Sequence, residues 1–132
     1  MFQYLDRISL NAPHIKTIII DDSQYLMGHE FMSRALEKGF DKFTEIGKKY
    51  YDLIMFCKGL RSDLNIYFLS HVDESDSGNT KMKTIGRMLD DKICLEGLFT
   101  ITLETYVDNG NYYFLTQNSG AKHTQHLSLI HI

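Results

Sequence analysis

The sequence lacks the residues and the long apolar runs that define several classes of protein. It has two cysteines, Cys57 and Cys94, which stand far apart without a CxxC pattern. Neither a zinc site nor a disulfide framework is therefore expected, and a reducing compartment is the default. No apolar run is long enough to span a membrane, and the N-terminus lacks the basic-then-apolar order of a signal peptide. We expect a cytoplasmic protein with no membrane partner.

Charge of one sign is also not in excess. The formal net charge is −3 and the isoelectric point is near 6.0. The chain therefore has no overall electrostatic footprint for nucleic acid, although a local basic face is compatible with these values. Of the 132 residues, 43% are hydrophobic and 23% are charged. This composition predicts one globular domain with a sizeable core.

Residues 14–23 carry the most informative pattern in the chain. A run of β-branched apolar residues at 17–20 ends abruptly in Asp21 and Asp22. Such a run predicts a central parallel strand that is buried on both faces, with the two acids at its carboxyl edge, where ligands bind in open α/β sheets. This is a Walker B pattern, in which the first acid helps to hold Mg²⁺ and the second orients or deprotonates water. The alternative is a buried strand followed by an Asp-rich turn.

Three helices are predicted before residue 61. Residues 1–10 have near-helical apolar spacing and are followed by a break at Pro13, and residues 25–38 predict a second helix that stops at Gly39. A third helix is predicted to start at Asp41, whose side chain can accept from the free amides of the first turn. Lys42 is expected on its solvated side. The apolar stripe of this helix, expected to cover a sheet, comprises Phe43, Ile46, Tyr50, Leu53, Ile54, Cys57 and Leu60.

A second strand with a polar end follows these helices. Residues 64–69 are mostly apolar and lead into Ser70 and His71. A strand, a helical connection and another strand predict a right-handed βαβ crossover, which would place Ser70 and His71 beside Asp21 and Asp22. Residues 72–83 are predicted to form a mobile loop over this edge, with a cationic end.

The last predicted elements form a hairpin. Residues 99–107 alternate between apolar and polar, residues 112–116 form an apolar and aromatic run, and Asn109-Gly110 between them favours a tight turn. Together, these elements predict an α/β fold with a mostly parallel sheet, helical crossovers and a C-terminal antiparallel hairpin.

Six segments of the chain, taken in order, carry a family resemblance: residues 18–27, 39–43, 68–71, 83–89, 96–100 and 113–120. They resemble phage-type ATP-binding proteins of the RecA-like AAA class, which are P-loop ATPases. The resemblance covers roughly residues 14–121. It implies a RecA-like P-loop NTPase core that binds ATP and Mg²⁺, forms homo-oligomers and works in DNA recombination or replication with single-stranded DNA and a single-stranded-DNA-binding protein.

The sequence departs from this class at the phosphate-binding loop. No G-x-x-x-x-G-K-[ST] motif occurs in the 132 residues. Without its backbone amides and lysine, the β- and γ-phosphates lose their main anchor. We therefore expect either a pseudo-domain or a fragment whose N-terminal βα unit is missing, and no activity from this chain alone.

The C-terminal residues 127–132 read Leu-Ser-Leu-Ile-His-Ile. This is the translation of CTG TCT CTT ATA CAC ATC, which matches a transposon-end adapter used in sequencing libraries. We expect residues 1–126 to be a partial ATPase domain and residues 127–132 to be adapter read-through. The alternative is a genuine amphipathic strand. We leave these six residues out of the fold prediction.

The resemblance gives each candidate residue a role. Asp21 would hold Mg²⁺, partly through water, and Asp22 would activate the attacking water. His71 resembles the polar sensor that reads the γ-phosphate; otherwise it is a surface residue at a strand end.

Further candidates lie later in the chain. Lys83 and Arg87 could reach the γ-phosphate of a neighbouring subunit, where positive charge stabilises the transition state; otherwise they belong to a solvated face. The nucleotide edge would be lined by Ser70, Thr116, Gln117 and Asn118, for which a polar strand end is the simpler interpretation. The whole chain is thus either part of an ATPase domain of the single-strand annealing type or a non-catalytic nucleotide-fold module that binds a protein partner.

Overall fold

A computed structural model of the chain describes residues 1–74, 80–85, 93–116 and 127–131. The helices are α1 (Phe2–Asn11), α2 (Tyr25–Ser33), α3 (Asp41–Lys58) and the short 3₁₀ helix η1 (Glu96–Leu98). The strands are β1 (Thr17–Ile20), β2 (Asn65–Glu74), β3 (Thr80–Met82), β4 (Ile101–Asp108), β5 (Asn111–Leu115) and β6 (Leu127–His131).

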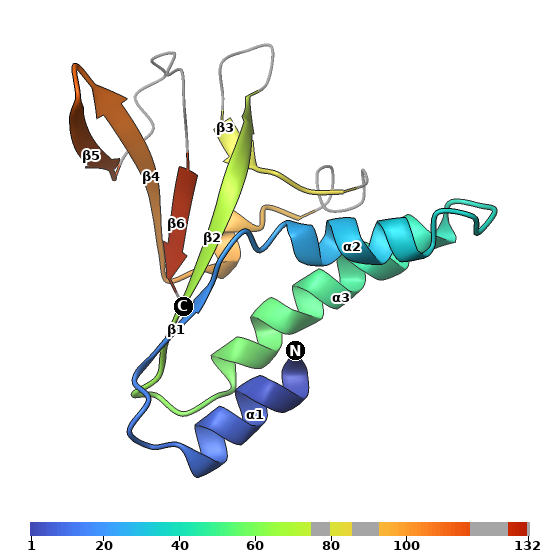
Figure 1. The fold of residues 1–132 in the computed structure, drawn as a ribbon, viewed down its shortest axis with the longest axis horizontal. Coiled ribbons are helices and arrows are strands. Elements are labelled where there is room, and N and C mark those ends of the chain that lie inside the picture. The colour runs from blue at the N-terminus through green and yellow to red at the C-terminus, as the bar shows by residue number, and fades with distance from the viewer. Residues whose placement is uncertain (75–79, 86–92, 117–126, 132) are drawn as a thin grey trace.

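The strands form a single mixed sheet in the order β1-β2-β6-β4-β5, and β3 pairs with β2 (Figure 1). β1 and β2 are parallel neighbours with Thr17 opposite Asn65 and Ile20 opposite Phe68, so the predicted parallel pairing is confirmed. The other pairings among the described strands are antiparallel. The prediction of a mostly parallel sheet is therefore wrong for this part of the chain, because hairpin partners and β6 occupy the places beside β2 and β4.

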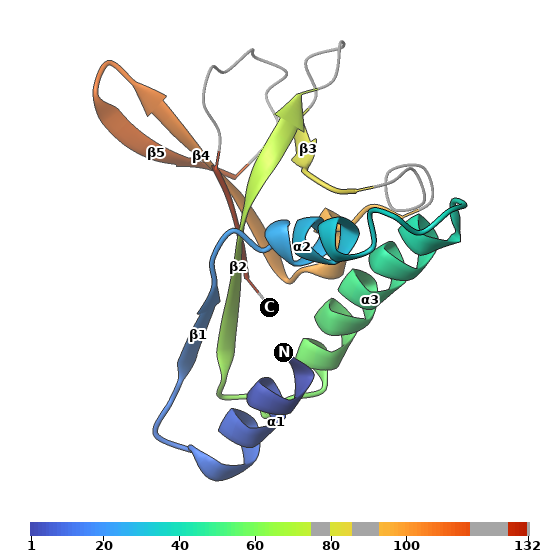
Figure 2. The same cartoon turned by 45° about the vertical axis from the view of Figure 1, so that its right-hand side comes forward.

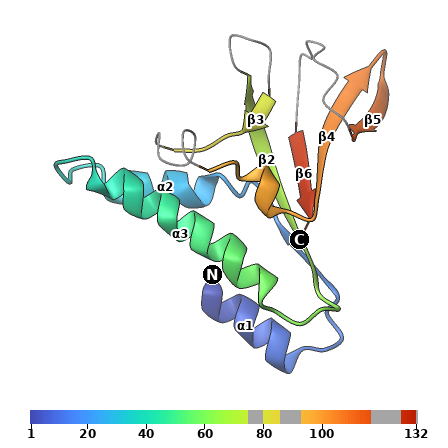
Figure 3. The same cartoon turned by 180° about the vertical axis from the view of Figure 1, so that it is seen from behind.

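The helices lie on one side of the β1–β2 part of the sheet. α2 and α3 connect β1 to β2, and α1 packs beside α3 on the same side (Figures 1 and 3). The core between these helices and the sheet contains Ile20, Ile66 and Phe68 from the strands. Five of the seven residues of the predicted stripe of α3 are buried, namely Ile46, Tyr50, Leu53, Ile54 and Cys57. Phe43 is half-buried, and Leu60 lies beyond the end of the helix.

The opposite face of β1 is open. Side chains alternate across a strand, so Ile18 and Ile20 point toward the helices while Thr17 and Ile19 point away from them. Ile19 is 62% exposed, and the turned view shows the described helices on one side only (Figure 2). The prediction that this strand is buried on both faces is wrong, because β1 is the last strand of the order and has one helical layer.

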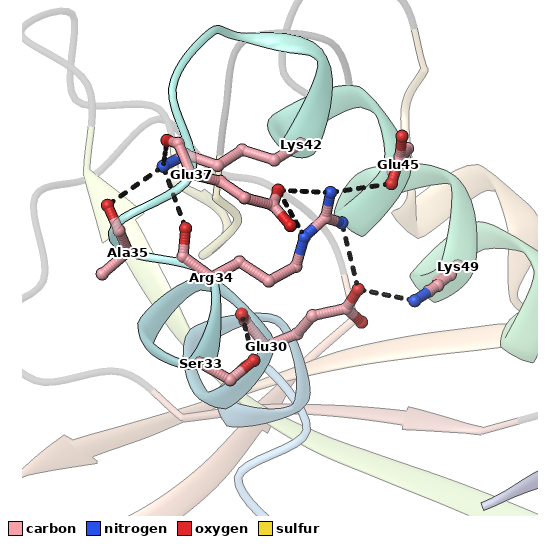
Figure 4. Close-up of polar contacts among 8 residues, drawn as sticks. All are labelled: Glu30, Ser33, Arg34, Ala35, Glu37, Lys42, Glu45 and Lys49. Carbon is pink, nitrogen blue, oxygen red and sulfur yellow. Dashed lines mark hydrogen bonds and ion pairs between the residues drawn. The ribbon is translucent and has the colours of Figure 1, made fainter.

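The turn between α2 and α3 differs from its prediction. α2 ends at Ser33 and not at Lys38, although Gly39 does adopt the positive φ, 92°, expected of a stop. The Lys42 Nζ donates hydrogen bonds to the carbonyls of Arg34 at 3.2 Å, Ala35 at 3.3 Å and Glu37 at 2.8 Å (Figure 4). These bonds give carbonyls of the segment between α2 and α3 a side-chain donor in place of helical N–H groups.

Lys42 is consequently buried, at 8% exposed, and its predicted place on a solvated face is wrong. Its ammonium also lies 5.6 Å from the ring centre of Phe31 and 5.7 Å from that of Phe43. The predicted cap by Asp41 is wrong as well, because Phe40 is the N-cap residue and makes no side-chain cap bond. Asp41 lies in the first turn, where its negative charge favours the helix dipole.

Arg34 completes this turn. Its guanidinium lies 2.7 Å from the Glu37 carboxylate, 2.8 Å from that of Glu45 and 3.4 Å from that of Glu30 (Figure 4). The hydrogen bond from Arg34 holds the pKa of Glu37 below its usual range. Lys49 in turn lies 2.6 Å from Glu30. These residues lie at the turn of the helical hairpin that α2 and α3 form, and not in the β4–β5 hairpin. We name them the hairpin cluster: Glu30, Arg34, Glu37, Lys42, Glu45 and Lys49.

The predicted C-terminal hairpin is confirmed. β4 and β5 are antiparallel, and Asp108 pairs with Asn111 across the turn. Asn109 and Gly110 both have positive φ, 48° and 79°, as a type I′ turn requires. The segment left out of the fold prediction, residues 127–131, forms β6 between β2 and β4. Its assignment to adapter sequence stays a prediction, because strand pairing does not reveal the origin of a sequence.

Candidate functional site

The polar ends of β1 and β2 meet at one edge of the sheet, as predicted. Asp21 and Asp22 directly follow β1, and the parallel register brings the end of β1 beside residues 69–71 of β2. The His71 Nε2 lies 3.1 Å from the Asp22 Oδ1, and both side chains are about half exposed. Chain segments almost 50 residues apart thus place a base and an acid side by side and open to solvent.

The buried side chain of Gln24 links Asp22 to Ser70 and His71 through hydrogen bonds. Its Nε2 donates to the Asp22 Oδ1 at 3.3 Å, and its Oε1 accepts from the Ser70 Oγ at 3.0 Å and from the His71 backbone N–H at 3.3 Å. Gln24 is only 7% exposed and Ser70 is fully buried. Ser70 therefore supports the site through Gln24, and it does not face the nucleotide edge as predicted.

The turn after β1 is fixed by backbone geometry. Asp22 has a φ of 48°, a left-handed conformation that Asp and Asn tolerate better than most residues. Its N–H donates to the Asp21 Oδ1 at 3.0 Å, and the Ser23 N–H donates to the Leu69 carbonyl at 2.8 Å. These bonds hold both carboxylates at the end of the strand.

Below this turn lies a buried hydroxyl pair. The Ser23 Oγ lies 2.8 Å from the Tyr50 hydroxyl of α3, and both residues are buried. Burial raises the pKa of Tyr50, and the hydrogen bond with Ser23 partly opposes this shift. The pair ties the site to the helical layer. We name Asp21, Asp22, Gln24, Ser70 and His71 the strand-edge cluster.

A cavity of about 470 Å³ opens beside His71. Lys83 lies on its wall because the Lys83 N–H donates to the His71 carbonyl at 2.9 Å. The Lys83 Nζ lies 3.5 Å from the Asp73 carboxylate, so within this chain the predicted finger pairs with an acid. The cavity is lined by Gln24, Tyr25, Gly28, His71, Val72, Lys83, Thr84 and Ile85.

Of the remaining predicted residues, only Thr116 lies within the described ranges, and it is not at this edge. Thr116 follows β5, which lies at the opposite end of the strand order from β1. Arg87, Gln117 and Asn118 lie outside the described residues. The prediction of a loop over residues 72–83 is wrong for residues 72–74 and 80–82, because these pair as the ends of β2 and β3; residues 75–79 lie outside the described ranges.

The donor set at the edge suits a magnesium ion that is shared with phosphate. Within the described ranges, no three His, Cys, Asp or Glu side chains gather as a complete metal site. Mg²⁺ does not need a complete set of protein ligands, because it usually takes one or two carboxylates, several waters and the phosphates of its nucleotide. In the same ranges the Asp21 carboxylate pairs only with the Asp22 N–H. Asp21 and Asp22 thus fit the protein's share of such a site, and the missing glycine-rich loop leaves the phosphate side without its usual anchor.

Sequence reasoning missed Gln24, Ser23 and Tyr50. Gln24 gives no signal beyond its place two residues after Asp22, and Tyr50 was assigned only to the apolar stripe of α3. Each acts through a contact across more than 25 residues of chain.

Comparison of this chain with known protein families, with curated proteins and with solved structures gives no match. None of the helices in the described ranges is long and apolar enough to cross a membrane.

Proposed function

We propose that this chain is part of an ATP-binding domain of the P-loop class, and that the strand-edge cluster faces the phosphates of Mg-ATP. The observation that carries the proposal is the 3.1 Å contact between His71 and Asp22 at the carboxyl ends of two parallel strands. Ligands of open α/β sheets bind beyond such strand ends. The resemblance in sequence supplies the nucleotide and the link to DNA recombination or replication.

Each side chain has a role that suits its geometry. Asp21 is exposed and would hold Mg²⁺ through one oxygen or a bound water. Asp22 would accept a proton from the attacking water, and His71, beside it, would donate a hydrogen bond to a phosphate oxygen. Bound Mg-ATP supplies the phosphoanhydride bond that is hydrolysed. Gln24 and Ser70 position these groups and do not touch the nucleotide.

The chain alone binds nucleotide weakly and does not hydrolyse it, because it has no phosphate loop. In the parent protein, the proposed partners are single-stranded DNA, a single-stranded-DNA-binding protein and further copies of the same subunit. Its proposed location is the cytoplasm, that of the host cell if a phage encodes it.

A titration of the ¹⁵N-labelled chain with Mg-ATP, followed by NMR, tests this proposal. We expect shift changes at residues 21–24 and 70–71, with a dissociation constant in the millimolar range, which corresponds to roughly −4 kcal/mol. Asp22→Asn and His71→Ala should weaken binding several-fold, and Thr116→Ala should leave it unchanged. Micromolar binding would contradict the role given to the missing loop.

The second candidate is a non-catalytic module that binds a protein partner. The absence of the G-x-x-x-x-G-K-[ST] motif from the sequence favours it. It predicts no shift changes at the strand-edge cluster with Mg-ATP at any concentration. The same titration therefore separates the two functions.

A further inference from the structure

In the part of the chain that the structure describes, the edge strand β5 has none of the features that usually keep another strand away. Within the described ranges it pairs with β4 alone, and it lies at the end of the sheet far from α1, α2 and α3 (Figures 1 and 2). Edge strands are commonly protected by charged side chains, prolines or bulges. The β5 sequence, Asn-Tyr-Tyr-Phe-Leu, has none of these. Tyr112, Tyr113 and Phe114 are 84%, 49% and 58% exposed.

The backbone of β5 turns the hydrogen-bonding groups of two residues away from β4. In a two-residue hairpin the pair that flanks the turn exchanges hydrogen bonds, and such pairs alternate along the strands. Asp108 and Asn111 flank this turn, and Tyr106 is opposite Tyr113. The N–H and C=O groups of Asn111, Tyr113 and Leu115 therefore point toward β4. Those of Tyr112 and Phe114 point away from the sheet.

An antiparallel copy of the same strand can satisfy both residues at once. When a two-fold axis passes between the two copies of Tyr113, Tyr112 of one subunit lies opposite Phe114 of the other, and the two exchange both hydrogen bonds. If the register shifts by two residues in either direction, either Tyr112 or Phe114 has no partner residue in the other β5 strand. The symmetric register also puts Tyr112 and Phe114 side by side on one face, as a cross-strand aromatic pair that is repeated by the symmetry.

We propose that β5 is a self-complementary dimerisation edge, through which two copies of this chain join their sheets antiparallel with Tyr113 at the two-fold axis. The outward backbone groups and the exposed aromatic side chains lie at the same two positions, 112 and 114. The strand also has no charged side chain that would repel a second copy. This interface is at the opposite edge of the sheet from β1 and leaves the strand-edge cluster accessible.

Sedimentation equilibrium over a range of concentrations tests the interface. We expect a concentration-dependent dimer for the chain and a monomer for Phe114→Lys, which places two like charges in the seam. Tyr4→Lys, at another exposed aromatic residue, on α1, should still dimerise, and circular dichroism should show that all the variants are folded. A chain that is monomeric throughout, or one whose dimer survives Phe114→Lys but not Ile19→Lys on the other edge strand, would overturn the proposal.

Disulfide trapping tests the register independently. In the symmetric register the two copies of residue 113 form a non-hydrogen-bonded pair with Cα atoms about 4.5 Å apart, within the range that a disulfide spans. In a Cys94→Ser background, Tyr113→Cys should therefore form a covalent dimer under oxidation much faster than Tyr112→Cys, whose copies are not opposite each other. Equal rates, or a faster reaction of Tyr112→Cys, would contradict the register.

Discussion

The hairpin cluster and the strand-edge cluster are built from similar charged and polar side chains but differ in how far the chain itself satisfies them. In the hairpin cluster, Lys42 donates to three carbonyls and Arg34 contacts three carboxylates. In the strand-edge cluster, the Asp22 carboxylate and the His71 imidazole contact each other and remain about half exposed. Charged groups that are saturated within the chain hold its shape, while groups left accessible at a sheet edge can bind something else.

The two clusters also differ in which segments of the chain they join. The hairpin cluster joins two consecutive helices and fixes the turn between them. The strand-edge cluster joins segments that are far apart in sequence. Its own buried members, Gln24 and Ser70, support the exposed ones, and the buried Ser23–Tyr50 pair lies next to them. Its exposed groups are therefore positioned by buried ones, which is the arrangement expected of a binding site.

The largest effect should come from removing the buried ammonium of the hairpin cluster. Lys42→Met would leave the carbonyls of Arg34, Ala35 and Glu37 without their donor, so we expect the free energy of unfolding to fall by about 1–3 kcal/mol. Urea denaturation measures this change. Lys48→Met on the same helix is the matched control, because the exposed ion pair of Lys48 with Asp52 contributes only about 0–1 kcal/mol. Equal losses in both variants would remove the distinction between saturated and exposed charges.

A smaller, pH-dependent effect is expected beneath the strand-edge cluster. The pKa of Tyr50 is raised by burial, so its contribution to stability is fully present below the unfolded pKa of about 10 and is lost as the pH rises above that value. Tyr50→Phe should cost about 0.5–1.5 kcal/mol near neutral pH, because Ser23 loses its partner, but should show a shallower alkaline decline. Thermal unfolding from pH 7 to 11 measures both slopes. Parallel curves would contradict the burial of an un-ionised hydroxyl.

The smallest effect on stability should come from the accessible pair itself. Asp22→Asn keeps the tolerance for positive φ and alters only one exposed contact, that with His71, so the free energy of unfolding should change by less than about 1 kcal/mol. The change in His71→Gln should be equally small. A loss of several kcal/mol in urea denaturation would show that this pair, like the hairpin cluster, serves the fold.

Local patterns predicted those parts of the molecule whose cause is local. The positive φ tolerance of Asn109 and Gly110 gave the hairpin turn, and the apolar run at 17–20 with the polar end at 70–71 gave the parallel pair. The end of α2 was not predictable in this way, because the carbonyls of the segment that follows it are satisfied by Lys42, in the next helix.

The exposed residues of the strand-edge cluster were predicted from the sequence. The buried residues that position them were missed or, for Ser70, given another role. Carboxylates and a histidine after apolar strands are a visible pattern, whereas Gln24 is recognisable only once β2 lies beside it. The open face of β1 was also missed, since an apolar run gives no sign of whether its strand is central or at an edge.

Paramagnetic broadening by Mn²⁺-ATP tests the account most directly, because Mn²⁺ can replace Mg²⁺ and marks the nuclei around it. We predict that amide signals of residues 21–24 and 70–71 broaden first, and that Asp21→Asn reduces this broadening while Asp108→Asn on the β4–β5 hairpin does not. Broadening centred on another part of the chain, or broadening that is unchanged in Asp21→Asn, would contradict the assignment of the strand-edge cluster as the site that faces the metal and phosphates.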